Sequence, residues 1–164
     1  MAAVPATLTL LHQQLPTSLR AVPMALEHVD ALAIMQAQVM PNPWSAAQFS
    51  GSLEAGHISW VVGAGEALAG VIVFSLVVDE LELLTLAVNK SHQRQGLART
   101  LLHCGLRGLE VASAARCTLE VMQGNEPAIK LYQSAGFTEV GRRKHYYRLD
   151  SGPVDALVMQ RTQT

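Results

Sequence analysis

The segment VNKSHQRQGLARTLL, Val88–Leu102, decides the fold, because an apolar run ends where an amphipathic run begins. A strand that ends at Val88 and a helix that begins near Gly96 leave several amide N–H groups without intrahelical partners, next to the positive end of a helix dipole. Phosphates and other anions bind at such helix starts. Gly96 also lets a ligand approach the backbone closely, so we predict an anion-binding turn between the two elements.

The residues around this glycine support the prediction without identifying the ligand. Ala98 keeps the first helical turn slim, and Arg94 and Arg99 can donate charge-assisted hydrogen bonds. Ordinary helix starts also use small residues, so the turn alone does not define a site. The chain lacks GxxxxGK[ST], and it lacks GxGxxG followed by an acidic residue about 20 positions on. The pattern therefore argues against a P-loop nucleotidase or a dinucleotide-binding enzyme.

The composition predicts a single globular domain. The chain has 164 residues, of which 49% are hydrophobic and 15% charged, enough to bury a core without metals or disulfides. Its 12 Lys and Arg against 13 Asp and Glu create no polycationic field, so we expect no direct contact with nucleic acid. Cys104 and Cys117 lack the spacing of a zinc site or a redox pair, which favours core positions and a cytoplasmic protein.

The N-terminus is expected to differ from the rest of the chain. Residues 1–18 carry an apolar patch with no Lys or Arg before it, which argues against an export signal. We expect an extension without regular structure, or an extra edge element, followed by a single domain over residues 19–164. The longest apolar run, Ala67–Val78, has 12 residues. This is too short to span a bilayer, so no membrane association is predicted.

Hydrophobic periodicity predicts a mixed α/β domain. Period-2 patterns and apolar runs indicate strands, 3.6-residue periods indicate helices, and proline, glycine and capping residues mark the ends. Ser45 is the expected N-cap of the second helix, and Gly136 the expected stop of the last. The expected strands are 19–22, 57–63, 67–79, 80–88, 117–122, 137–149 and 155–160, and the expected helices are 26–39, 45–53, 96–112 and 127–135.

Several motifs, in this order, resemble one family. Gln93–Ala98 has the form Q/R-x-x-G-x-G/A after the strand LLTLAV, similar to the pyrophosphate motif of the GCN5-related N-acetyltransferases (GNAT). The motifs NPWS, DELELLTLAV, LEV with NEPAIKLYQSAGF, and RRKHYY extend the resemblance over about residues 19–160, closest within the family to the ribosomal-protein alanine N-acetyltransferases of the RimI type. It implies the GNAT fold, a mixed and mostly antiparallel central sheet with helices on both faces. Ala98 is a permitted variant, whereas Met122 and Gly124 depart from the pattern and could alter what the acceptor groove prefers.

The resemblance also implies acetyl-CoA as the co-substrate and a set of residues that holds it. A strand backbone would bind the pantetheine arm and present an N–H to the thioester oxygen, the turn would wrap the pyrophosphate, and an asparagine would add a contact. No residues have metal-ligand spacing, so no metal is predicted. The implied coenzyme residues are Leu86, Ala87 and Val88 on the strand, Arg94, Gln95, Gly96, Leu97, Ala98 and Arg99 in the turn, and Asn125.

Glu120 and Tyr132 are the predicted catalytic residues. Acetyl transfer to an amine needs a base for the amine and a proton for the departing thiolate. Glu120 alternates with Leu119 and Val121, so on a strand it faces away from both. By themselves, such a carboxylate is more often a solvated strand residue and such a tyrosine more often a core aromatic. The resemblance assigns Glu120 as the base and Tyr132 as the acid, with Glu82 as the reserve base.

The predicted acceptor is the α-amine of a protein N-terminus. Making a lysine neutral costs about 3.5 kcal/mol more than making an α-amine neutral, so a single weak base suits the α-amine. This agrees with the resemblance to enzymes that act on the N-terminal alanine of a small-subunit ribosomal protein. Two hypotheses stay open: acetylation of a lysine or a small amine, and a non-catalytic acetyl-CoA-binding module. Trp44, Tyr146 and Tyr147 could line the acceptor groove, although packing explains Trp44 equally well.

Overall fold

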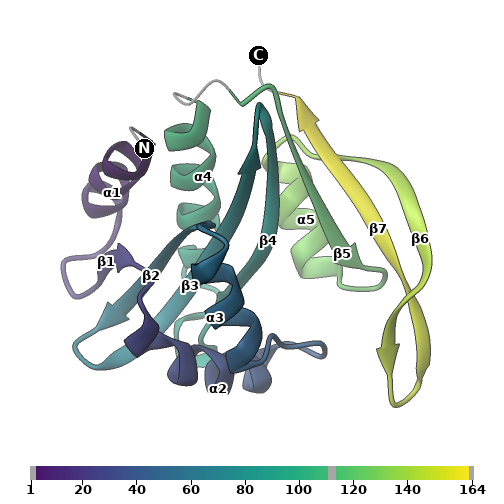
Figure 1. Ribbon diagram of the computed structural model, residues 1–164, viewed down its shortest axis with the longest axis horizontal. Coiled ribbons are helices and arrows are strands. Elements are labelled where there is room, and N and C mark those ends of the chain that lie inside the picture. The colour runs from purple at the N-terminus through teal and green to yellow at the C-terminus, as the bar shows by residue number, and fades with distance from the viewer. Residues whose placement is uncertain (1–2, 111–113, 163–164) are drawn as a thin grey trace.

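A single mixed β-sheet organises the molecule (Figure 1). The computed structural model describes residues 3–110 and 114–162, with side chains described from residue 6 onward. Over this part of the chain, seven strands lie in the order β1-β2-β3-β4-β5-β7-β6, and β4 and β5 are the one parallel pair. The strands are β1 (Arg20–Pro23), β2 (Ile58–Ala64), β3 (Ala67–Val77), β4 (Glu80–Val88), β5 (Arg116–Met122), β6 (Thr138–Leu149) and β7 (Gly152–Thr162).

Helices cover both faces of this sheet. One apolar core joins the sheet to α1, α4 and α5, and a second core joins the opposite face to α2 and α3. The predicted fold class, a mixed and mostly antiparallel sheet with helices on both faces, is confirmed. The helices are α1 (Ala3–Gln14), α2 (Val29–Val39), α3 (Ala46–Glu54), α4 (Leu97–Glu110) and α5 (Glu126–Ser134), with 3₁₀ turns η1 (Leu26–His28) and η2 (Lys90–His92).

Helix α4 lies close to the centre of the sheet. Its leucine stripe is buried, with Leu101 and Leu109 fully so. A Cβ atom added at Gly105 would lie 2.7 Å from the ring of Phe74 on β3. Because real Cβ atoms do not approach a neighbour that closely, glycine at this position sets the distance between α4 and the sheet. The turn before α4 is thereby held at a fixed place over the strands.

The N-terminal residues form a helix where the sequence predicts an extension without regular structure or an extra edge element. Helix α1 packs against α4 (Figure 1), and Leu11 is fully buried in the contact. A Cβ atom added at Gly108 would lie 2.8 Å from the Thr7 Cβ, so the two helices touch through a glycine. Threonines and a proline lower the intrinsic helix propensity of this segment, and packing against α4 compensates for it. The boundary at residue 18 stays a prediction.

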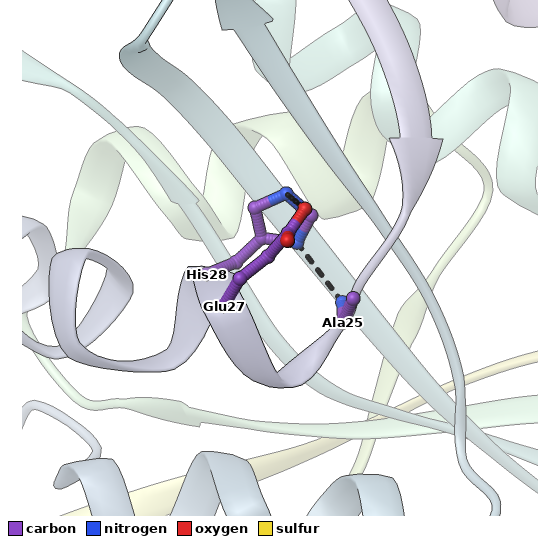
Figure 2. A network of polar contacts seen from close by, with 3 residues as sticks. All are labelled: Ala25, Glu27 and His28. Carbon is purple, nitrogen blue, oxygen red and sulfur yellow. Dashed lines mark hydrogen bonds and ion pairs between the residues drawn. The ribbon is translucent and has the colours of Figure 1, made fainter.

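The predicted helix over residues 26–39 divides into η1 and α2. Figure 2 shows the polar contacts at the start of η1. The Ala25 N–H donates to Nδ1 of His28 at 2.9 Å, and Nε2 of His28 lies 3.7 Å from the Glu27 carboxylate. Because Nδ1 accepts this bond, the ring proton is on Nε2 when the imidazole is neutral. The histidine side chain thus supplies the cap that Ala25 cannot provide.

The other boundaries follow the sequence signals within a few residues. Ser45 is the N-cap of α3, as predicted, and its side chain accepts from the Gln48 N–H while Gln48 reaches back to the Ser45 N–H. Gly136 follows α5 with a φ of +90°, as expected for a helix stop. Strand β7 is longer than its predicted range of 155–160, because its pairing with β5 and β6 extends it in both directions.

Strands β4 and β5 separate halfway along their length. The parallel ladder joins Glu80–Leu83 to residues 116–119, and the strands then diverge (Figure 1). A β-bulge in β4 begins at the same point, because Leu83 pairs with Phe74 and Thr85 with Val73, which leaves Leu84 as an extra residue. The bulge bends β4 away from β5. One backbone edge of β4 therefore lacks a described strand partner from residue 84 to residue 88.

Candidate active site

The turn between β4 and α4 has the geometry that the sequence predicts. Gly96 has a φ of +82° and Arg94 a φ of +59°, so the chain adopts the left-handed conformation twice within three residues. Helix α4 begins at Leu97, which is buried, and the Thr100 N–H makes the first helical bond to Gly96 O at 3.0 Å. The amide N–H groups of the first turn therefore face outward beside two exposed arginines, Arg94 and Arg99. This is an arrangement suited to a diphosphate.

Side chains within the turn hold its shape. Nε2 of Gln93 donates to Val88 O at 3.1 Å, and Nε2 of Gln95 donates to Ser91 O at 3.2 Å. The Asn89 side chain accepts from the Ser91 N–H and donates to Leu68 O on β3 at 2.9 Å. The turn is thus fastened to the sheet at its start. Of the predicted coenzyme residues, Gln95 acts through its side chain to support the turn.

The strand before the turn has one backbone edge without a partner strand among the described residues, where only Val88 O is occupied, by the Gln93 side chain. Leu86, Ala87 and Val88 pair with Ile72, Val71 and Gly70 of β3 on one side, whereas the ladder to β5 ends at Leu83 on the other. Ala87 and Val88 are buried and Leu86 is half-buried. An extended molecule could add to this edge as a further strand does.

Glu120 is the acidic residue of β5 next to the point where the strands separate. Its neighbours Leu119 and Val121 are buried in the core with α5, and Glu120 faces the opposite side, as predicted. Its side chain is 18% exposed, and Oε1 lies 2.6 Å from Nε of Arg143 on β6. Glu120 also bonds the Tyr146 hydroxyl and thereby raises the pKa of that phenol, with burial as the second cause. The carboxylate is therefore held by two residues of β6.

Tyr132 lies on the other side of β5, in the core with α5. It is 8% exposed, and its ring packs edge-on against Phe137 with centroids 6.0 Å apart. Burial raises the pKa of the Tyr132 phenol, followed by repulsion from Tyr147 and Cys117. Tyr147 also interacts with Glu120, and burial with this charge raises the pKa of Tyr147 to about 12. All these phenols stay protonated at neutral pH.

The two predicted catalytic residues thus lie on opposite faces of β5. Leu119 and Val121 share the core of Tyr132, whereas Glu120 points the other way. A ligand on either face alone would meet one of the two residues. A ligand threaded between the separated ends of β4 and β5 could meet both.

Four other residues singled out from the sequence lie near this point of the sheet. Asn125 is the N-cap of α5 and accepts from the Ala128 N–H at 3.5 Å, so it has a structural role of its own. Gly124 before it has a φ of +90°, which explains the glycine there. Met122 is half-buried at the end of β5, and Glu82 on β4 is exposed. The exposed Glu82 is less desolvated than Glu120.

A buried polar link that the sequence does not reveal connects α2 to β4. Gln36 is fully buried, its Nε2 donates to the Thr85 hydroxyl at 2.7 Å, and its Oε1 accepts from the Trp44 N–H at 2.8 Å. Thr85 follows the bulge of β4, and Trp44 packs edge-on against Phe49, with centroids 5.2 Å apart. The loop before α3 is therefore fastened to the strand with the free edge. The period of α2 predicts which residues face inward, but not what a buried glutamine binds.

The part of the chain that the structure describes holds neither a metal-binding cluster nor a membrane-spanning helix. Over residues 3–110 and 114–162, no cluster of three or more His, Cys, Asp or Glu could hold a metal ion. No helix in the same part of the chain is long and apolar enough to cross a membrane. The cytoplasmic location inferred from the sequence stays a prediction.

Comparison with known proteins gives consistent matches. The sequence model described as the acetyltransferase (GNAT) family matches residues 30–137. The ribosomal protein bS18-alanine N-acetyltransferase of Escherichia coli K12 is 35% identical over 117 residues, which are 71% of this chain and 79% of that protein. The N-alpha-acetyltransferase RimI of Mycobacterium tuberculosis is 34% identical over 146 residues, 84% of this chain and 89% of that protein. The crystal structure of the ribosomal-protein-S18-alanine N-acetyltransferase from Escherichia coli has a TM-score of 0.82 at 29% identity, over 88% of this chain and 93% of that chain.

These matches confirm the resemblance that the motifs indicate. The family match covers the bulged strand, the turn at Gly96, the carboxylate strand and α5 in one continuous span. Acetyl-CoA is accordingly the co-substrate. The chain belongs to the acetyltransferase (GNAT) family and is an acetyl-CoA-dependent N-acetyltransferase.

Proposed function

We propose that this protein acetylates the α-amine of an N-terminal alanine on a small-subunit ribosomal protein. Two relatives at about one-third identity carry names that describe N-terminal acetylation, one of them on the alanine of ribosomal protein bS18. The observation that carries the proposal is the position of Glu120, a mostly buried carboxylate on β5 beside the free edge of β4. A base at that place can reach an amine that approaches a thioester bound along β4.

The coenzyme in this proposal lies where the two strands separate. Its diphosphate accepts from the N–H groups that open α4, with charge from the flanking arginines, and its pantetheine arm adds to the free edge of β4. A β4 N–H then points at the thioester oxygen and stabilises the negative charge that develops there. The residues involved are Leu86, Ala87, Val88, Arg94, Gln95, Gly96, Leu97, Ala98 and Arg99, with Asn125 at the start of α5.

The reaction is a direct transfer. Glu120 accepts a proton from the α-ammonium group through a water molecule and passes it to solvent, and the neutral nitrogen attacks the carbonyl carbon. A C–N bond forms, the attacking nitrogen gives its second proton to Glu120 by the same route, the tetrahedral oxyanion collapses, and the C–S bond breaks. Tyr132 supplies a proton toward the thiolate, and both residues regain their starting protonation states by exchange with solvent. The raised pKa of Tyr132 keeps its proton available at neutral pH, and makes the phenol a hydrogen-bond donor more than a strong acid.

The choice of an α-amine follows from the cost of deprotonation. Neutralising a lysine at pH 7 costs about 3.5 kcal/mol more than neutralising an α-amine, and one carboxylate that is already paired with Arg143 has little reserve to supply it. Trp44 and Tyr146 are candidates to line the acceptor groove. Tyr146 is 49% exposed and contacts Glu120, so an acceptor backbone can lie on it.

The test is mass spectrometry of a peptide that begins with alanine and contains one internal lysine, incubated with the enzyme and acetyl-CoA. We expect a single acetyl group on the α-amine. Glu120→Gln should lower kcat by roughly 10²- to 10⁴-fold, the usual contribution of a general base, and Tyr132→Phe should also lower it. Acetylation of the lysine alone, or turnover of small amines but not of the peptide, would contradict the proposed acceptor. Unchanged activity of both variants would contradict the proposed catalytic residues.

A further inference from the structure

The Glu120 carboxylate has a partner that the motifs do not assign. Nε of Arg143 lies 2.6 Å from Oε1 of Glu120. Arg143 is on β6, and β7 lies between β6 and β5 in the sheet. The arginine therefore reaches over a whole strand to meet this carboxylate. An exposed arginine side chain could extend directly into solvent. An ion pair that reaches across a neighbouring strand therefore needs a geometric cause.

An irregularity of β6 provides that cause. Arg143 pairs with Ala156 and Tyr147 with Val154, so four steps along β6 correspond to two along β7. His145, within this bulge, has a φ of +54°, and its N–H donates to Oδ1 of Asp155 at 2.9 Å. In a regular strand, two residues three positions apart point to opposite faces. The extra residues let Arg143 and Tyr146 approach the same carboxylate.

The neighbouring arginine shows what an ordinary surface pair looks like. Nε of Arg142 lies 2.8 Å from Glu139, three residues earlier on the same strand, and both side chains are more than 40% exposed. Exposed pairs of this kind contribute little to stability or function. Glu120 is 18% exposed, so the carboxylate of the Arg143 pair is partly shielded from water, while the Arg143 side chain is itself 60% exposed. Arg143 also lies over the Tyr146 ring, with 5.5 Å between its guanidinium carbon and the ring centroid.

We propose that Arg143 is a positioning residue that holds the Glu120 carboxylate in the orientation in which it accepts the acceptor's proton. The inference rests on the proposed function, because it takes Glu120 as the base. A general base works only from within hydrogen-bond reach of its proton, and a glutamate on a strand without a side-chain partner has rotamers that point elsewhere. Arg143 and Tyr146 contact the Glu120 carboxylate from the β6 side and restrict its rotamers. The β4 side of the carboxylate then stays available to the amine.

Arg143→Met tests this role, with Arg142→Met as the matched control. Methionine retains the apolar stem and removes the guanidinium. We expect kcat for the alanine peptide to fall about tenfold, a fraction of the full general-base contribution. The Kd for acetyl-CoA should stay within about twofold, because the ion pair lies away from the diphosphate turn. Arg143→Lys should recover part of kcat, since lysine restores the charge without the planar fork. Arg142→Met should match the wild-type enzyme in kcat and KM.

A double-mutant comparison separates positioning from general damage. If Arg143 acts through Glu120, adding Arg143→Met to Glu120→Gln should cause no further fall in kcat. An equal fall in both backgrounds, an unchanged kcat in Arg143→Met, or an increase in kcat would each overturn the inference. Full activity of Glu120→Gln would instead overturn the proposed function. Thermal unfolding of every variant verifies that the compared enzymes are folded.

Discussion

The three tyrosines of the chain, Tyr132, Tyr146 and Tyr147, all have raised pKa values. A hydrogen bond to Glu120 raises the pKa of Tyr146, and burial, followed by the charge of Glu120, raises the pKa of Tyr147. Burial also raises the pKa of Tyr132, with Tyr147 as the second cause. Each effect keeps a phenol protonated. Tyr146 and Tyr147 thus lie with the Glu120 carboxylate, whereas Tyr132 lies on the other face of β5.

Tyr147 gives this arrangement a measurable dependence on pH. Burial and then the charge of Glu120 raise its pKa to about 12, against a reference value of about 10. As the pH rises through 10, the unfolded chain loses the phenol proton and the folded chain retains it, so the unfolded state binds fewer protons and the free energy of unfolding falls. Tyr147→Phe should lose less stability than the wild type between about pH 10 and pH 12 in urea unfolding. Equal losses would contradict the assignment.

At the residue scale, the sequence predicted the direction in which a side chain points better than the residue that it contacts. Alternation with Leu119 and Val121 was enough to place Glu120 on the face away from the core. Its partner Arg143 could not be predicted, because the contact depends on extra residues in β6 that shift the register without any proline or glycine at the bulge. The link from Gln36 to Thr85 was hidden for a similar reason, since the two residues are 49 positions apart.

At the element scale, one turn and one pair of separated strands create the site. The turn could be predicted, because glycine at a strand-to-helix transition is a local signal, and Gly96 does adopt a left-handed conformation. The separation of β4 from β5 could not be predicted, because the break in alternation at Leu83 and Leu84 does not reveal which neighbouring strand the bulge turns away from. The short helix before Arg20 was missed because its stability depends on contact with α4.

Gly96→Ala tests the turn. Alanine at a φ of +82° is strained, so we expect a loss of about 1–2 kcal/mol in the free energy of unfolding. The strain should also distort the N–H groups that open α4 and raise the Kd for acetyl-CoA several-fold by calorimetry. Gly51→Ala is the matched control, because this glycine lies in α3 with open space around an added Cβ and should leave the Kd unchanged. Equal Kd values for both variants would show that the turn does not bind the coenzyme.

At the scale of the whole molecule, the sheet is two sections joined by a short parallel ladder. Strands β1 to β4 carry the coenzyme edge and the turn, and β5, β7 and β6 carry Glu120 and its two partners. The element types were predicted, but the position of β7 between β5 and β6 was not, since the order of strands in a sheet depends on long-range pairing. The proposed reaction occurs where the two sections part.

The most direct test is a crystal structure of the protein with acetyl-CoA. The account predicts the diphosphate on the N–H groups of residues 96–98, the pantetheine arm along β4 from residue 86 to residue 88, and the thioester between β4 and β5 with Glu120 on one side and Tyr132 on the other. A coenzyme bound with its diphosphate elsewhere, or with its arm outside the space between the two strands, would contradict it.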